Sequence, residues 1–163
     1  MSRSSRLRAL VGSALAAPGA AGSVLRTAAG VLTARLGAAA RLIRGHGPRG
    51  LALVAWTMLA CRRVRRQLAR GGLGAVRLAA PPPGGTDTLV RRALSRSGGN
   101  CLESALVRQR WFAERGVPRT VVIGVSAPAA GFHAHAWLDG DPDPHRHGLA
   151  EILRHPVPSA WLR

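Results

Sequence analysis

The sequence predicts an α+β domain preceded by an arginine-rich helical region, and three observations support this class. Apolar residues recur at helical spacing through much of the first half. A proline- and glycine-rich segment at 80–85 cannot continue a helix or a strand ladder. Beyond it, a capped helix beginning at Cys101 precedes segments with the composition or alternation of β-strands. We therefore divide the 163 residues into an N-terminal region (1–79), a linker (80–85) and a C-terminal domain (86–163).

The N-terminal region and the start of the C-terminal domain carry helix signals in order. Apolar spacing predicts an amphipathic helix over 23–44, with arginines elsewhere around its circumference. A second helix is expected from Leu51 to Arg70, with five arginines near its C-terminal end and two glycines after it. A short helix, capped by residue 86 or 87, should then run to Ser97.

The charge is unevenly distributed. All 24 basic residues are arginines, and the net charge is +17. Residues 1–98 hold 17 arginines and one acid, whereas residues 99–163 hold seven arginines and six acids. Such a field favours anionic partners such as acidic peptides or lipid headgroups. Because the first half lacks aromatic stacking residues and a groove-reading motif, we expect no nucleic-acid partner. Peripheral contact of residues 23–44 with an anionic membrane stays open.

Cysteine content and hydropathy indicate the compartment. Cys61 and Cys101 form neither a disulfide framework nor a metal knuckle, which fits a reducing, cytoplasmic setting. Residues 1–20 have the outline of a signal peptide, but their apolar stretch is weak and interrupted by glycine. The strongest apolar run, 51–61, is about half the ~20 residues that a membrane span needs. No transmembrane helix is expected.

The segment Asn100-Cys101-Leu102-Glu103 predicts a reactive cysteine. Asn100 is a favoured N-cap, and Glu103 three residues later completes a capping box, so a helix should begin at Cys101. Unpaired backbone N–H groups at a helix start favour a thiolate, the nucleophilic form of cysteine. The alternative reading is a small buried apolar residue. A β-branched strand, expected to be central, follows at 120–125.

A second candidate segment is 132–138, whose alternation puts His133, His135 and Trp137 on one face of a strand. Either histidine could instead be a core residue satisfied by the backbone, and we prefer that reading for His133. The turn residues at 140–144 predict a chain reversal after this strand.

A Cys–His pair needs a third group to orient the imidazole. Asp139 lies too far along the same strand from His135. Asp141 and Asp143 fit local turn bonds, although either could serve in a looser turn. If the hairpin centres near Asp143, Glu151 faces His135 and is the preferred third residue.

Four segments in register carry a family resemblance. Together they resemble the transglutaminase-like B-protein domain of lasso-peptide gene clusters, over about residues 86–154: Asn100-Cys101-Leu102-Glu103, Gly116-Val117-Pro118, Val122-Ile123-Gly124-Val125 and Ala134-His135-Ala136-Trp137. The resemblance maps the family's cysteine and histidine onto Cys101 and His135. It implies a papain/transglutaminase-like cysteine-protease core, with the cysteine on a helix and the histidine on antiparallel strands.

The resemblance further implies a peptidase that removes the leader from a ribosomally made precursor peptide. Cys101 would attack the leader–core carbonyl, His135 would protonate the leaving amine, and the Cys101 N–H with Asn100 would support the oxyanion. A cyclase and a separate leader-recognition protein are possible partners, and no cofactor or resident metal is expected.

Three other readings stay open. Cys101 and the histidines could form a zinc site, since thiolate and imidazole are zinc ligands: the histidines concerned are His133, His135, His145 and His147. The same fold could bind peptides without catalysis. The enzyme could also transfer the acyl group to an amine rather than to water.

Overall fold

A computed structural model describes residues 20–126 and 131–162. The chain divides into two compact units, Met1–Arg41 and Leu42–Arg163, and the second contains the candidate site. Helix α1 (Ala20–Gly71) crosses the division and is kinked at Gly47, whose φ of 66° is in the region that favours glycine. The two helices expected over 23–44 and 51–70 are therefore confirmed as helical segments. The side chains that defined the amphipathic face of 23–44 lie outside the described residues.

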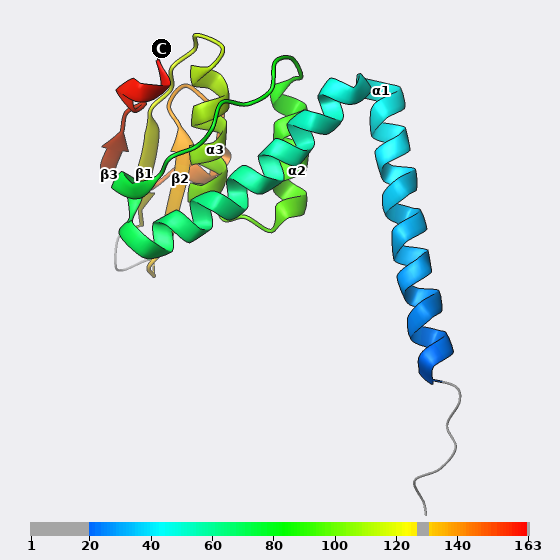
Figure 1. The fold of residues 1–163 in the computed structure, drawn as a ribbon. Helices are drawn as coiled ribbons and strands as arrows, with labels where there is room; N and C mark the ends of the chain where they lie inside the picture. Colours follow the sequence, from blue (N-terminus) through cyan, green and yellow to red (C-terminus); the bar gives the residue numbers. More distant parts are fainter. Residues whose placement is uncertain (1–19, 127–130, 163) are drawn as a thin grey trace, which may run out of the picture. The chain divides into compact units, whose positions relative to one another are not determined.

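The remaining elements of the second unit give the α+β class that the sequence predicts (Figure 1). Among the described residues of this unit, three short 3₁₀ helices accompany two α-helices and three strands. In chain order these are η1 (Leu73–Ala75), α2 (Asp87–Ser97), α3 (Cys101–Ala113), β1 (Val121–Val125), β2 (Ala134–Leu138), η3 (Pro144–Arg146), β3 (Ala150–His155) and η4 (Ser159–Trp161).

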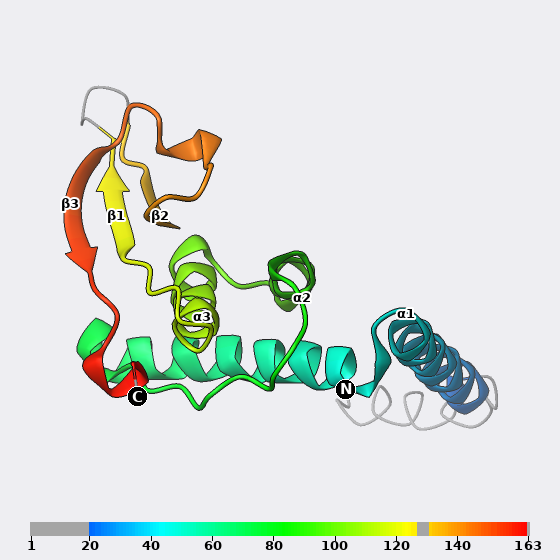
Figure 2. The ribbon, with the colours of Figure 1, turned by 90° about the horizontal axis from the view of Figure 1, so that it is seen from above.

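The core lies between α1, α3 and the sheet. In Figure 2, α3 lies between the three strands and the C-terminal half of α1, with α2 beside it. Leu53 and Val64 of α1 are fully buried in the same apolar cluster as Leu106 of α3 and Val121 of β1. The sheet therefore rests on the helix that begins at Cys101, and this helix rests on α1.

The position of α1 corrects the predicted domain boundary. We placed the junction at 80–85, but the compact unit begins at Leu42, and residues on both sides of this segment share one core. Val76 and Leu78, just before the prolines, are buried. The prolines end regular structure without separating domains, because an irregular segment can cross the surface of a core that continues on either side.

The order of the strands corrects a second prediction. Strand β1 is central, as expected, and pairs antiparallel with both β2 and β3. Gly124 of β1 faces His135 on one side and Glu151 on the other. The predicted hairpin, with Glu151 directly opposite His135, is wrong: the connection after β2 contains η3 and is long enough to carry β3 to the far edge.

Candidate active site

Cys101 occupies the first position of α3, as the sequence predicts. The Asn100 side chain accepts the Glu103 N–H at 2.8 Å, and the Glu103 carboxylate accepts the Asn100 N–H at 3.3 Å. The capping box is therefore confirmed. Cys101 is partly buried and lines a cleft, whereas Asn100 is exposed and does not line it.

Glu103 does more than cap the helix. Its carboxylate is buried and accepts two hydrogen bonds from Arg65 of α1, each at 2.9 Å. Arg65 holds the pKa of Glu103 below its usual value, against the opposing effect of burial. This ion pair fixes the start of α3 against α1. This partner of Glu103 could not be predicted from the sequence, because Arg65 is one of five arginines within nine residues.

The other cysteine, Cys61, lies behind the same helix start. It is 1% exposed, and its sulfur lies 3.6 Å from the Glu103 carboxylate and 3.3 Å from the Ser97 hydroxyl. Burial raises the pKa of the Cys61 thiol, and the neighbouring Glu103 adds to this effect although the Ser97 hydrogen bond opposes it. Cys61 is a core residue, which leaves Cys101 as the cysteine that can meet a ligand.

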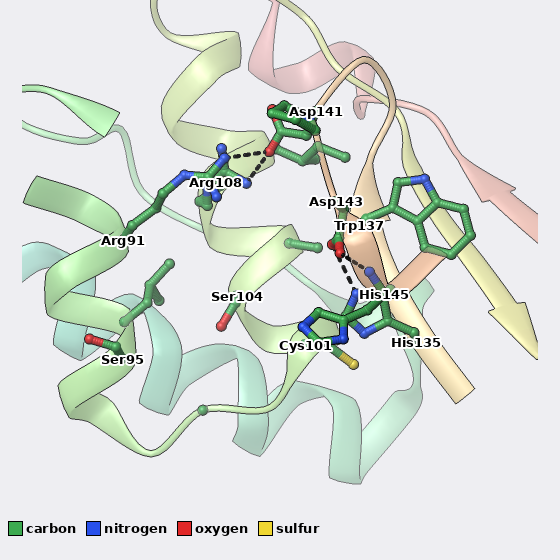
Figure 3. Close-up of a pocket in the computed structure, with 16 residues that line it drawn as sticks. Arg91, Ser95, Cys101, Ser104, Arg108, His135, Trp137, Asp141, Asp143 and His145 are labelled. Carbon is green, nitrogen blue, oxygen red and sulfur yellow. Dashed lines mark hydrogen bonds and ion pairs between the residues drawn. The ribbon is translucent and has the colours of Figure 1, made fainter. Parts of the chain in front are cut away.

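His135 lies on β2 and is bound to an acid. Its Nε2 is 2.9 Å from Asp143 Oδ2, and the other Asp143 oxygen accepts the His145 N–H at 2.9 Å. The His135 ring is nearly parallel to Trp137, at 17° and 6.0 Å between centroids, and it contacts the edge of His145 at 5.6 Å. These contacts hold the imidazole on three sides (Figure 3).

The Asp143 carboxylate is suited to remain ionised. Burial alone raises its pKa, but the hydrogen bonds with His135 and with the His145 backbone outweigh burial, and the net pKa lies below the usual value. An ionised Asp143 accepts a hydrogen bond from Nε2–H and so selects the tautomer in which Nδ1 carries the lone pair.

The acid predicted for this role, Glu151, lies elsewhere. It is on the exposed strand β3, and its carboxylate binds Arg154 at 2.7 Å. The sequence indicates a local turn bond for Asp143, with a role beside His135 only in a looser turn. The carboxylate makes both contacts because it has two oxygens: one accepts the His145 N–H, and the other binds Nε2 of His135.

The cleft brings Cys101 together with the His135–Asp143 pair (Figure 3). Its volume is about 540 Å³. Sixteen residues of α2, α3, β2 and the following turn line it: Arg91, Leu94, Ser95, Gly99, Cys101, Ser104, Ala105, Arg108, His135, Ala136, Trp137, Leu138, Asp141, Pro142, Asp143 and His145. A cleft that contains a thiol and an oriented imidazole can support nucleophilic attack on an acyl carbon.

The structure brings only part of the alternative zinc set to the cleft, namely Cys101, His135 and His145. His133 precedes β2 and is exposed, and neither it nor His147 lines the cleft. Among residues 20–126 and 131–162, no group of three or more histidine, cysteine or acidic side chains is placed to hold a metal ion.

A cysteine at a helix start beside a histidine–carboxylate pair on an antiparallel sheet is the arrangement of Cys–His–acid sites. The chain belongs to the transglutaminase-like superfamily, whose family model matches residues 51–151, more than half of the sequence. This superfamily includes cysteine peptidases. No curated protein and no solved structure matches the chain. Within the part of the chain that the structure describes, no helix is long and apolar enough to cross a membrane.

Proposed function

We propose that the chain is a cysteine peptidase that removes the leader from a ribosomally made, lasso-type precursor peptide. The observation that carries the proposal is that Cys101, at the start of α3, and the His135–Asp143 pair line one cleft. Three roles that acyl transfer requires, namely nucleophile, base and orienting acid, are thereby represented in a single site.

The reaction follows from these positions. Because Asp143 binds Nε2, the Nδ1 of His135 is the ring nitrogen left to take the Cys101 proton. The thiolate sulfur attacks the carbonyl carbon of the scissile bond, and His135 returns the proton to the leaving amine nitrogen as the C–N bond breaks. Water, deprotonated by His135, then attacks the thioester, releasing the carboxylic acid and restoring the thiol.

The start of α3 also offers an oxyanion site. The Asn100 side chain already caps Glu103, and the Asn100 carbonyl accepts the Ser104 N–H at 3.0 Å. The N–H groups of Cys101 and Leu102 have no carbonyl four residues earlier within the helix. We assign the Cys101 N–H as the donor to the oxyanion and give Asn100 the capping role alone.

The peptide substrate is supported by the sequence segments and by charge. The Cys101 and His135 segments resemble those of lasso-peptide B proteins, and the +17 chain favours an acidic leader. In this proposal the enzyme acts in the cytoplasm, beside a cyclase and a separate leader-recognition protein.

Cleavage of a precursor peptide tests the proposal. Short peptides encoded by the genes that neighbour this chain's gene are each incubated with the purified protein, and the products are identified by mass spectrometry. Cys101→Ala is expected to abolish cleavage at the leader–core junction. Asp143→Asn is expected to lower kcat by up to ~10⁴-fold, because an amide selects the wrong tautomer.

Glu151→Gln is the matched control, since it removes an acid of β3 that binds Arg154 instead of His135. It should leave kcat near the wild-type value. Cleavage that persists in Cys101→Ala would contradict the proposal, and tight binding of the peptide without cleavage by the wild type would favour the noncatalytic alternative.

A further inference from the structure

Asp141 is a buried carboxylate held by three arginines. Its oxygens lie 2.5 Å from Arg108 of α3, 2.6 Å from Arg119, which precedes β1, and 2.8 Å from Arg91 of α2. The side chains of Asp141 and Arg108 are only 8% and 9% exposed. One acid therefore ties the turn after β2 to three separate parts of the unit.

The turn couples Asp141 rigidly to the acid of the candidate site. Only Pro142 separates Asp141 from Asp143, and Pro144 follows, so φ is fixed at two of the four positions 141–144. The Asp141 N–H also binds the Leu138 carbonyl at 3.1 Å, at the end of β2. The place of the Asp143 carboxylate thus depends on where Asp141 is anchored.

Arg108 links this anchor to the nucleophile. It follows Cys101 by seven residues on α3, which is close to two helical turns, so both lie on one face. Both side chains line the cleft, Arg108 beside Asp141 and Cys101 near the His135–Asp143 pair (Figure 3). The Arg108–Asp141 contact therefore sets the position of the acid turn along the helix that carries the cysteine.

We propose that Asp141 is a positioning residue: through its ion pairs with Arg108 and Arg119 it holds the turn that carries Asp143 in register with α3, so that His135 meets Cys101. This inference rests on the proposed function. Asp141 itself touches neither His135 nor Cys101 in the contacts of the described residues; it acts through the turn.

The role is separable from folding. Arg108 also binds Asp87 through two hydrogen bonds, at 2.9 and 2.8 Å, and this bidentate pair joins α2 to α3 without Asp141. Replacing Asp141 by asparagine leaves the buried guanidinium paired and keeps the side-chain volume. The fold should persist while the turn loosens.

The test compares Asp141→Asn with Asp139→Asn in the full chain. Asp139 lies two residues away in the same segment, but it is half exposed and binds Arg154. A reagent that needs no substrate, iodoacetamide, reports on Cys101: its rate of alkylation at pH 6 relative to pH 9 measures how well His135 maintains the thiolate. Cleavage of the precursor peptide gives kcat and KM.

Asp141→Asn is expected to remain folded, to lower the pH 6 to pH 9 ratio as Asp143→Asn does, and to lower kcat roughly 10²-fold with a smaller change in KM. Asp139→Asn should behave as wild type. If Asp141→Asn does not fold, Arg119→Gln removes one anchor of Asp141 from outside the cleft and should lower the ratio partially.

Two failures are distinguishable. With Asp143→Asn impaired, either of two results would overturn the positioning role alone. One is a wild-type pH 6 to pH 9 alkylation ratio and a wild-type kcat in Asp141→Asn. The other is an unchanged alkylation ratio in Arg119→Gln. If neither Asp143→Asn nor His135→Gln alters the ratio or the cleavage rate, the proposed function fails with it.

Discussion

Truncation before the proline-rich segment should destroy the fold, although the sequence suggests a domain boundary there. A fragment 80–163 loses four buried leucine and valine side chains of the core, Leu53, Val64, Val76 and Leu78. Burial of each is worth about 1.5–3 kcal/mol, so the four together contribute roughly 6–12 kcal/mol. A typical domain has only about 5–15 kcal/mol of net stability. The fragment would also remove Arg65, the ion-pair partner of Glu103 at the start of α3.

Circular dichroism at 222 nm during thermal and urea unfolding measures this effect. A fragment 42–163 should unfold cooperatively with nearly the midpoint of the full chain, because it contains the whole compact unit. The fragment 80–163 should show no cooperative transition. A cooperative transition in 80–163 with the midpoint of 42–163 would refute the reasoning and restore the boundary at 80–85.

Two further predictions concern the sheet. Gly124→Ala should lower kcat in a protein that remains folded. A Cβ would lie 2.9 Å from the Trp137 ring, so this ring must shift and disturb its stacking on His135. An unchanged kcat would contradict this prediction. The thermal midpoint should fall as pH drops below about 6.5, because burial lowers the pKa of His155 in the folded state and only the unfolded chain then binds the proton. His155→Gln should flatten this slope; an equal slope in wild type and variant would exclude His155 as its source.

Local signals predicted the parts of the site that depend on local geometry. A capping box needs only residues 100–103, and a strand needs only its own alternation, so Cys101 and His135 could be placed on their elements from the sequence. The central position of β1 also followed from its apolar, β-branched composition.

Long-range pairing could not be predicted in the same way. The turn signal at 140–144 is real, but a turn does not specify which strand the chain joins next. That choice depends on the edges left open by the whole sheet, and β3 joined the far edge of β1. Likewise, the link between Arg65 and Glu103 spans 38 residues and involves one arginine among many.

The scarcity of acids gives a way to recognise Asp143. The chain has seven acidic residues and 24 arginines, so each acid is expected to form an ion pair with an arginine. All seven acids lie in the described residues. Six acids follow this expectation and bind arginine: Asp87, Glu103, Glu114, Asp139, Asp141 and Glu151. Among the ion pairs of the described residues, Asp143 alone binds histidine.

An arginine on Asp143 would compete with His135 for the carboxylate, since a guanidinium is always charged and can bind both oxygens. Three arginines close to this turn pair with another acid instead. Asp141, two residues earlier, takes Arg91, Arg108 and Arg119, and the His145 N–H occupies the second oxygen of Asp143. In this arginine-rich chain, the arrangement leaves the two oxygens of Asp143 to His135 and to the His145 N–H.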